Sequence, residues 1–250
     1  MALEFTTVIG LEIHIQLNTK TKIFCNCSTD YIGATPNSHI CPVCTGQPGA
    51  LPVLNGKVVE FGVRGGLALH CKINKSTRFD RKNYFYADLP KAYQITEYYV
   101  PLAENGYLTI AGDDGRPRRI GITRLHLEED AGKLVHVAAD GRIVGSSQSF
   151  VDYNRGGVPL AEVVSEPDIA SPREAREYVS AMRQLVRYLG ISDGDMEKGS
   201  MRVDANISQK VSDGRWGNRV EVKNMNSLKA LERALEYETL RQRDLLARGE

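Results

Sequence analysis

Hydrophobic and polar positions alternate most regularly over residues 10–17, with the sequence GLEIHIQL. Four aliphatic residues alternate there with Glu12, His14 and Gln16. This period of two predicts a β-strand with one apolar and one polar face. Polar side chains two positions apart on one face lie roughly 6.5–7 Å from each other. They are therefore either ordinary solvent-facing residues or half of a metal or catalytic site.

Four other segments show the same alternation. Residues 106–112 and 116–137 flank the turn Asp113–Asp114–Gly115, an arrangement that predicts a β-hairpin. Residues 200–208 and 218–226 alternate as two further strands. Together with the helices described next, these strands predict an α+β fold built on a largely antiparallel, curved sheet.

Two segments have the helical period instead. Residues 171–190 present one apolar stripe, and Ser171 with Glu174 has the spacing of a capping box at the start. Residues 227–248 are highly charged with a narrow leucine seam, which indicates a surface helix. Residues 51–71 are a weaker candidate because adjacent glycines interrupt them.

The composition is that of a globular protein of one large or two modest domains. The chain has 250 residues, 42% of them hydrophobic and 25% charged, and a net charge of +1. That charge neither favours nor excludes a nucleic-acid partner. The sequence contains no membrane-length apolar run and no signal-peptide pattern at its start, so we expect a cytoplasmic protein, or an organellar one after processing.

Four of the five cysteines are close together in the sequence. Cys25, Cys27, Cys41 and Cys44 have the spacing C-x-C-x13-C-x2-C. Because cytoplasmic cysteines are reduced, this cluster favours a metal over disulfides, and four thiolates suit a closed, structural zinc site. The alternative is four free thiols that are close in sequence by chance. Cys71 stands apart and is expected in the core.

Acids and histidines recur on the polar faces of the predicted strands. In residues 116–137, Arg124, His126 and Glu128 share one face, and Glu129 points to the other. If the strands pair suitably, one face of the sheet gathers several unpaired carboxylates, which repel each other unless a cation neutralises them. Oxygen-rich ligands with one imidazole suit Mg²⁺ or Mn²⁺. The candidate ligands are Glu12, His14, Glu128, Asp204 and Glu221. Separate solvent-facing strand faces explain the pattern equally well.

A segment rich in cations and aromatic rings points to a nucleotide or nucleic acid. Arg81, Lys82 and Lys91 lie among seven aromatic residues between Phe79 and Tyr99. Such interleaving suits contacts with phosphates and bases, although dense aromatic residues also occur in ordinary cores.

Six segments between Val8 and Ser227 resemble those of the GatB family, the B subunits of the glutamyl/aspartyl-tRNA amidotransferases. The archaeal E-type subunit of the glutamyl-specific enzyme is a related alternative. The segments are VIGLEIHIQLNTKTKIFCNCS, FDRKNYFYADLPKAYQIT, GITRLHLEEDAGK, NRGGVPLAEVVSEPDI, MRVDANIS and VEVKNMNS. The resemblance implies a cradle-like catalytic domain over residues 1–250, related to glutamine synthetase and guanido kinases, with a zinc loop at residues 25–44.

The resemblance also implies an activity. ATP phosphorylates the side-chain carboxylate of Glu or Asp misacylated onto tRNA(Gln) or tRNA(Asn), and ammonia then displaces the phosphate. The ammonia comes from a glutaminase (amidase) subunit through a channel, and a third, small subunit makes up the heterotrimer. ATP, Mg²⁺ or Mn²⁺, and a structural Zn²⁺ are the implied cofactors.

Specific residues take roles by the same resemblance. The metal ligands are again the five candidates named above, and Glu128, Glu129, Lys82 and Lys91 are implied to be catalytic. Glu129 is implied to be the channel-side acid facing Lys91. Lys82 is implied near the phosphates or the channel mouth, with Arg81 as a second nucleotide contact.

Family members are nearly twice as long and carry helical and tail domains that hold the tRNA. We therefore expect this chain to be a fragment without those domains. The competing hypothesis of another class is a zinc-stapled RNA-binding module without catalysis, which rests on the cysteine loop and the aromatic segment. The converging acids favour the enzyme, because a module that only binds RNA does not need them.

Overall fold

The structure is a computed structural model that describes residues 3–137 and 143–250. Helices in this part of the chain are α1 (Gly56–Ala68), α2 (Pro172–Tyr188) and α3 (Leu228–Ala247). The strands are β1 (Phe5–Gln16), β2 (Lys72–Ile73), β3 (Arg78–Asn83), β4 (Tyr93–Val100), β5 (Ala103–Ala111), β6 (Pro117–Glu129), β7 (Lys133–His136), β8 (Ser149–Asp152), β9 (Pro159–Ser165), β10 (Met201–Val211) and β11 (Val220–Met225). The predicted α+β class is confirmed.

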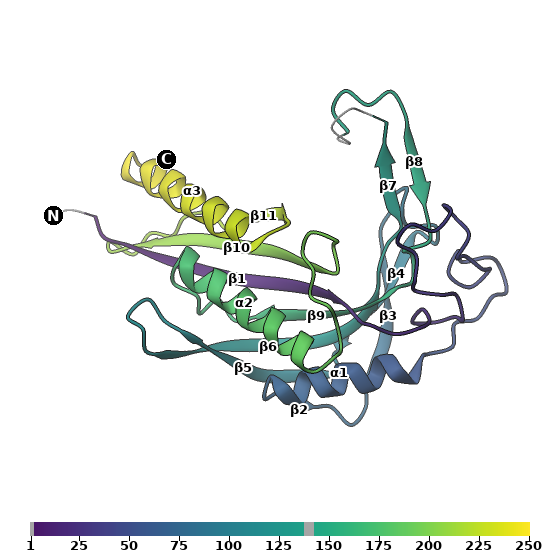
Figure 1. Cartoon of the computed structure of the whole chain (residues 1–250). Coiled ribbons are helices and arrows are strands. Elements are labelled where there is room, and N and C mark those ends of the chain that lie inside the picture. The colour runs from purple at the N-terminus through teal and green to yellow at the C-terminus, as the bar shows by residue number, and fades with distance from the viewer. Residues whose placement is uncertain (1–2, 138–142) are drawn as a thin grey trace.

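One large antiparallel sheet dominates the molecule. Its strand order is β11-β10-β1-β9-β6-β4-β3, and β5 pairs with β6 and β2. Along one edge of β6, β5 covers the stretch from Pro117 to Leu125, and β4 pairs farther along at Glu128. Figure 1 shows the sheet curving at that end, where the separate β7–β8 hairpin projects from it. This curvature forms the cradle.

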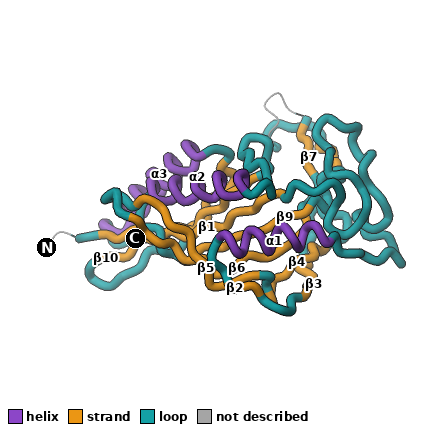
Figure 2. The backbone as a smooth tube through the Cα atoms, turned by 60° about the horizontal axis from the view of Figure 1, so that its bottom comes forward, coloured by secondary structure: helices purple, strands orange, loops and turns teal. Residues whose placement is uncertain are grey.

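The three helices lie against one face of the sheet (Figure 2). The aliphatic set of β1 faces them, and Ile13, Tyr178, Leu231 and Val58 belong to one continuous buried core. Burial of this apolar area is the main favourable contribution to folding. The opposite face of the sheet keeps the polar side chains of the alternating strands, and it is the inner face of the cradle.

The predicted hairpin is confirmed, because β5 pairs with β6 through a turn at Gly115, which has φ +76°. The alternating run does not continue to residue 137, however. β6 ends at Glu129, and the chain turns through Gly132 before β7 begins. A Cβ on Gly132 would lie 3.0 Å from two backbone oxygens, so the crowded turn favours glycine there.

The predicted helices are also present. Ser171 accepts a hydrogen bond from the Glu174 backbone nitrogen at 3.0 Å, as an N-cap does. In a standard capping box the Glu174 side chain would accept a hydrogen bond from the backbone nitrogen of Ser171. Here it accepts one from the backbone nitrogen of the preceding residue, Ala170, at 2.9 Å. Of the weaker candidate 51–71, residues Gly56–Ala68 form α1. Its Gly62, Gly65 and Gly66 let the helix pack closely against Leu125 and its neighbours.

Candidate active site and metal centre

The register of the central strands aligns four polar residues across the inner face. His14 of β1 lies opposite Arg202 on β10 and Glu162 on β9, and Glu162 lies opposite His126 on β6. Glu128 is two residues beyond His126, on the same face. Strand pairing alone therefore places two imidazoles and two carboxylates from three strands beside each other.

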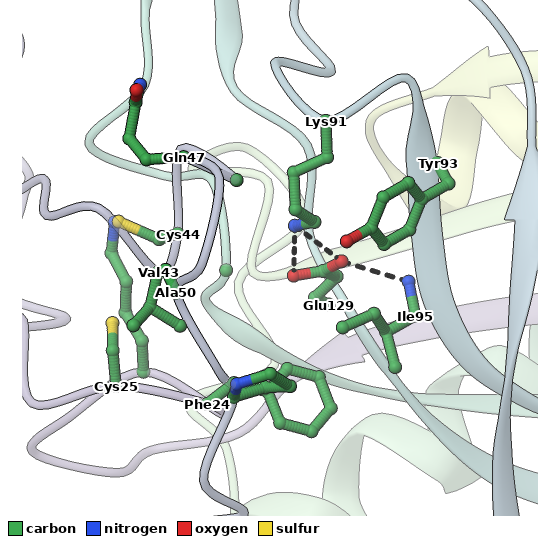
Figure 3. A pocket seen from close by; sticks show the side chains of 14 residues that line it. Phe24, Cys25, Val43, Cys44, Gln47, Ala50, Lys91, Tyr93, Ile95 and Glu129 are labelled. Carbon is green, nitrogen blue, oxygen red and sulfur yellow. Dashed lines mark hydrogen bonds and ion pairs between the residues drawn. The ribbon is translucent and has the colours of Figure 1, made fainter.

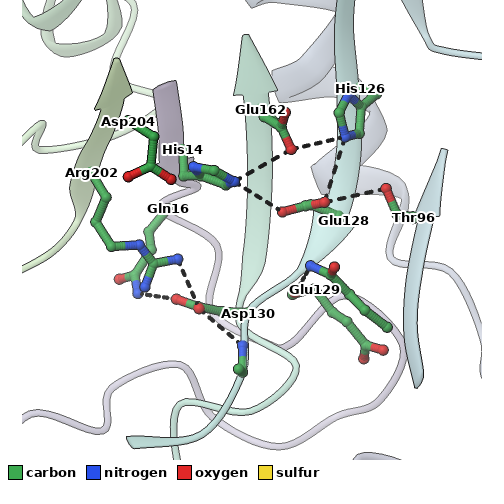
Figure 4. A network of polar contacts seen from close by, with 12 residues as sticks. His14, Gln16, Thr96, His126, Glu128, Glu129, Asp130, Glu162, Arg202 and Asp204 are labelled. Carbon is green, nitrogen blue, oxygen red and sulfur yellow. Dashed lines mark hydrogen bonds and ion pairs between the residues drawn. The ribbon is translucent and has the colours of Figure 1, made fainter. Parts of the chain in front are cut away.

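These four side chains form a compact cluster, drawn in Figure 4. His14 Nε2 lies 3.3 Å from a Glu162 oxygen and 3.7 Å from a Glu128 oxygen. His126 Nε2 lies 3.2 Å from Glu162 and 3.5 Å from Glu128. Donor atoms of His14, Glu128 and Glu162 all lie within 4.8 Å of one another, a spacing that one cation can bridge.

The protonation of this cluster shows how its charges balance. Burial opposes a charge on His126, yet the two carboxylates raise its pKa to about 9. Burial likewise opposes a charge on Glu162, but the two imidazoles hold the pKa of this carboxyl well below its usual range. The imidazoles thus stabilise the charge of Glu162. A cation held between His14, Glu128 and Glu162 would do the same, so this donor set fits a metal.

The predicted ligands do not all meet. His14 and Glu128 are brought together, whereas Glu12 lies one row away and accepts a hydrogen bond from Asn206 at 3.1 Å. Asp204 and Glu221 share the inner face but both pair with Lys223, at 3.3 and 2.8 Å. The roles of Glu12, Asp204 and Glu221 as ligands stay predictions.

Sequence reasoning missed Glu162 and passed over His126 as a ligand. Glu162 belongs to β9, a central strand that is buried on both faces. Residues 158–164, VPLAEVV, are therefore apolar except for Glu162 and do not alternate. A single acid inside such a run is the signal that was available. His126 was placed on the correct face, but only its neighbour Glu128 was selected.

A buried acid next to the cluster has its own partners. Asp130 pairs with Arg202 at 2.9 Å and Arg155 at 3.8 Å, and accepts a hydrogen bond from Gln16 at 2.8 Å. Although burial disfavours its charge, the two arginines hold the pKa of Asp130 below its usual range. This network fixes Arg202 beside His14.

Glu129 points away from the cluster, to the other side of β6. Both of its oxygens lie 2.7 Å from the Lys91 ammonium, and the Ile95 backbone nitrogen donates to one of them at 2.9 Å. Figure 3 shows this pair at a cavity of about 50 Å³ that Cys25 and Cys44 also line. Burial raises the pKa of Glu129, although Lys91 opposes that shift.

The four cysteines converge as the spacing predicts. All four sulfur atoms lie within 4.8 Å of one another, and those of Cys41 and Cys44 are 3.9 Å apart. A tetrahedral Zn²⁺ with bonds of about 2.3 Å needs sulfur atoms about 3.8 Å apart, so the cluster fits zinc. A hydrogen bond with Cys25 lowers the pKa of Cys44 to about 4, despite burial and with help from Lys22, 3.6 Å away. Cys71 is buried in the core, as expected.

Two cations of the aromatic segment, Arg81 and Lys82, lie on opposite faces of β3, and Lys91 lies in the connection between β3 and β4. Lys82 pairs with Gln94, two residues from Thr96, which contacts Glu128, so Lys82 lies on the inner face. Arg81 points to the opposite face, with its guanidinium 4.9 Å from the Tyr93 ring centroid. Of Arg81 and Lys82, only Lys82 shares the face of the His14–Glu128–Glu162 cluster.

A comparison with known families identifies the family of the chain. The family model described as the GatB/GatE catalytic domain matches residues 7–249. The chain belongs to the GatB/GatE catalytic-domain family. The match covers both the carboxylate–histidine cluster and the cysteine loop.

Similar proteins of the GatB/GatE family share one name, the B subunit of aspartyl/glutamyl-tRNA(Asn/Gln) amidotransferase. The Thermotoga maritima protein is 59% identical over 249 residues, which is 99% of this chain and 51% of the relative. The Carboxydothermus hydrogenoformans protein is 56% identical over 98% of the chain, and the Gloeobacter violaceus protein 55% identical over 99%. The chain spans about half the length of these curated relatives. Among the described residues of this GatB/GatE domain, none of the helices is both long and apolar enough to cross a membrane.

Proposed function

We propose that this chain is the catalytic cradle of a GatB-type protein in a tRNA-dependent amidotransferase, a glutamine-hydrolysing, ATP-dependent ligase. Its substrates are Glu-tRNA(Gln), Asp-tRNA(Asn) or both, and its product is the corresponding amide on the same tRNA. The observation that carries the proposal is that the carboxylates of Glu128 and Glu129 lie on opposite sides of β6. Each side suits one half of the reaction.

The first half is activation of the carboxylate on the inner face. An oxygen of the tRNA-borne carboxylate attacks the γ-phosphorus of ATP, a P–O bond to ADP breaks, and an acyl phosphate forms. His14, Glu128 and Glu162 would hold Mg²⁺ or Mn²⁺, which offsets the charge on the transferring phosphoryl group. Lys82 lies on the same face, where its ammonium can contact the phosphates. Recruiting Asp204 and Glu221 as further ligands requires Lys223 to release them.

The second half is amide formation. Ammonia attacks the carbonyl carbon of the acyl phosphate, a C–N bond forms, and phosphate leaves. Ammonia must arrive uncharged to be a nucleophile, so a base has to take the proton of ammonium. Glu129, which lines the small cavity, would take this proton, and its raised pKa suits a group that accepts and releases a proton. Lys91 holds the Glu129 carboxylate in place.

The proposed partners are a glutaminase (amidase) subunit, a third, small subunit, and misacylated tRNA, in the cytoplasm. The cysteine loop would carry a structural Zn²⁺ that takes no part in the chemistry. The archaeal E-type protein is less favoured, because the relatives named above are all of the B type. A non-catalytic RNA-binding module is less favoured because it has no need of the buried Glu128 and Glu162.

Phosphate release from ATP tests this function. The chain, assembled with the glutaminase and the small subunit, should release phosphate with Mg²⁺ and misacylated tRNA, and not with the same tRNA uncharged. Phosphate release that ignores the aminoacyl group would mean that the carboxylate is not the acceptor, and the proposal would fail.

A further inference from the structure

A buried lysine lies beside the cysteine loop, and neither half of the proposed reaction uses it. Lys22 stands shortly before Cys25 in the sequence, and 0% of its surface is exposed. Lysine is almost never fully buried unless its charge is paired. The surroundings of Lys22 must therefore supply a partner that stabilises its ammonium.

No carboxylate is that partner. Among the described residues, the Lys22 ammonium has no acidic side chain within ion-pair distance. It donates a hydrogen bond to the His39 carbonyl oxygen at 2.8 Å and lies 3.5 Å from the Tyr153 carbonyl oxygen. Its third contact is the Cys44 sulfur, at 3.6 Å. Carbonyl oxygens accept hydrogen bonds but carry no net charge, so the sulfur is the one of these three contacts that can become an anion.

The Cys44 sulfur also receives a second donor. The Cys41 backbone nitrogen donates to it at 3.2 Å, and hydrogen bonds of this kind to an ionised acceptor are among the stronger ones in proteins. Cys44 is buried, whereas Cys25, Cys27 and Cys41 are partly exposed. Of the four sulfurs, that of Cys44 therefore depends most on the protein, and least on water, to stabilise a negative charge.

The charge of a metal bound in the loop explains why a cation belongs there. Four thiolates around one Zn²⁺ leave two negative charges uncompensated, and burial makes uncompensated charge costly. An ammonium in contact with one of the sulfurs offsets part of this excess. Groups that donate to metal ligands from outside the coordination sphere raise metal affinity in this way.

We propose that Lys22 is the counter-cation of the metal centre in the cysteine loop, and that through Cys44 it stabilises the four-thiolate form and retains the metal. Lys22 is a positioning residue, since it acts on the metal through Cys44. The inference rests on the proposed zinc site and does not depend on the amidotransferase chemistry.

Lys22 also lies where the loop meets the turn after β8, so charge compensation has to be separated from simple packing. Besides the Lys22–Tyr153 contact, Asn154 joins the same two segments: its Oδ1 accepts from the His39 nitrogen at 2.7 Å, and its Nδ2 donates to the Thr35 carbonyl at 2.8 Å. These bonds hold the turn against the loop whether or not Lys22 carries a charge.

Metal affinity provides the first test. In the chain, Lys22→Met should weaken Zn²⁺ binding about 10- to 100-fold, measured by competition with a chromophoric chelator. Lys22→Gln, which keeps N–H donors but has no charge, should bind zinc as weakly as Lys22→Met. Lys20→Met, at an exposed lysine two residues away, is the matched control with wild-type affinity. Wild-type affinity in Lys22→Met, or recovery of affinity in Lys22→Gln, would overturn the inference.

Thermal unfolding provides the second test. With zinc bound, Lys22→Met should lower the melting temperature, because the excess negative charge loses its partner. In chelator the lysine itself is the charge without a partner, so Lys22→Met should leave the melting temperature unchanged or raise it. A lysine that only packs the loop predicts the same loss in both conditions, and that result would refute the role of Lys22 as counter-cation.

The proposals fail in different ways. A wild-type chain that binds no zinc would refute both the zinc site and the role of Lys22, and it would leave the proposed amidation untouched. A zinc-binding wild type with unaltered Lys22 variants would refute the role of Lys22 alone. Phosphate release that ignores the aminoacyl group would refute the proposed function and leave the measured zinc affinities as they are.

Discussion

Glu129→Gln separates the two halves of the proposed reaction. Glutamine keeps the shape of the side chain, and its carbonyl oxygen can still accept the hydrogen bond from the Ile95 nitrogen at 2.9 Å. The substitution removes the negative charge and the basicity of the Glu129 carboxylate. Phosphorylation on the opposite face of β6 should therefore stay near its wild-type rate, whereas transfer of glutamine-derived nitrogen should fall about 10²- to 10⁴-fold, the contribution of a general base.

The structure also gives the effect of this substitution on stability. The side chains of Lys91 and Glu129 are 6% and 3% exposed, so removing one charge leaves the other buried without its partner. Breaking a buried pair in this way costs about 3–5 kcal/mol. Lys91→Met combined with Glu129→Gln removes both charges and should recover most of the lost melting temperature, without recovering nitrogen transfer.

Two assays on the assembled complex measure the outcome. Phosphate release with misacylated tRNA reports activation, and amide formation on tRNA from labelled glutamine reports transfer. Glu128→Gln is the matched control on the neighbouring residue, and it should reduce phosphate release itself. Equal loss of phosphate release in both variants would refute the division of roles, and the two glutamates would then act as one metal-binding unit.

Three further predictions follow from the same geometry. The pKa of His126 in the folded protein is about 9, above its ordinary 6.5. Without divalent cations, protonated His126 should therefore stabilise the fold by at most about 3 kcal/mol below pH 6.5, and this stabilisation should be lost as the pH rises through 9. Thermal unfolding in the presence of a chelator measures it. Freshly purified chain should contain about one zinc by elemental analysis, and Cys41→Ser should lose it and melt earlier; a zinc-free wild type would contradict the cysteine site. Gly46→Ala should lower nitrogen transfer because the new Cβ would overlap the Lys91 side chain. Gly49 has a similar positive φ (+83° against +68°) but no atom within 4 Å of a Cβ, so Gly49→Ala should leave nitrogen transfer unchanged. Equal effects of the two substitutions would mean that backbone strain, and not contact with Lys91, causes the loss.

The sequence predicted the parts of the fold in which one face is apolar and the other polar. β1 and β10 alternate because helices cover one of their faces, and α2 has a stripe for the same reason. β3 and β4 were not predicted, because their cations and rings resemble a ligand-binding loop as much as a strand. The cysteine site was predictable because its ligands are close in sequence and of one chemical type.

The carboxylate–histidine cluster was predicted only in part, because its geometry depends on register. Alternation tells which face Glu12 and His14 share, but not which residue of the next strand lies opposite. The actual pairing puts Glu162 and His126 in the row of His14, and Asp204 in the row of Glu12. Glu128 lies two residues beyond His126 along β6, and its carboxylate still reaches the imidazoles of both His14 and His126. The period-two rule does fix the relation between Glu128 and Glu129 without any register. For this reason the two adjacent acids lie on opposite sides of the sheet, and substitutions there can test the two proposed reactions one at a time.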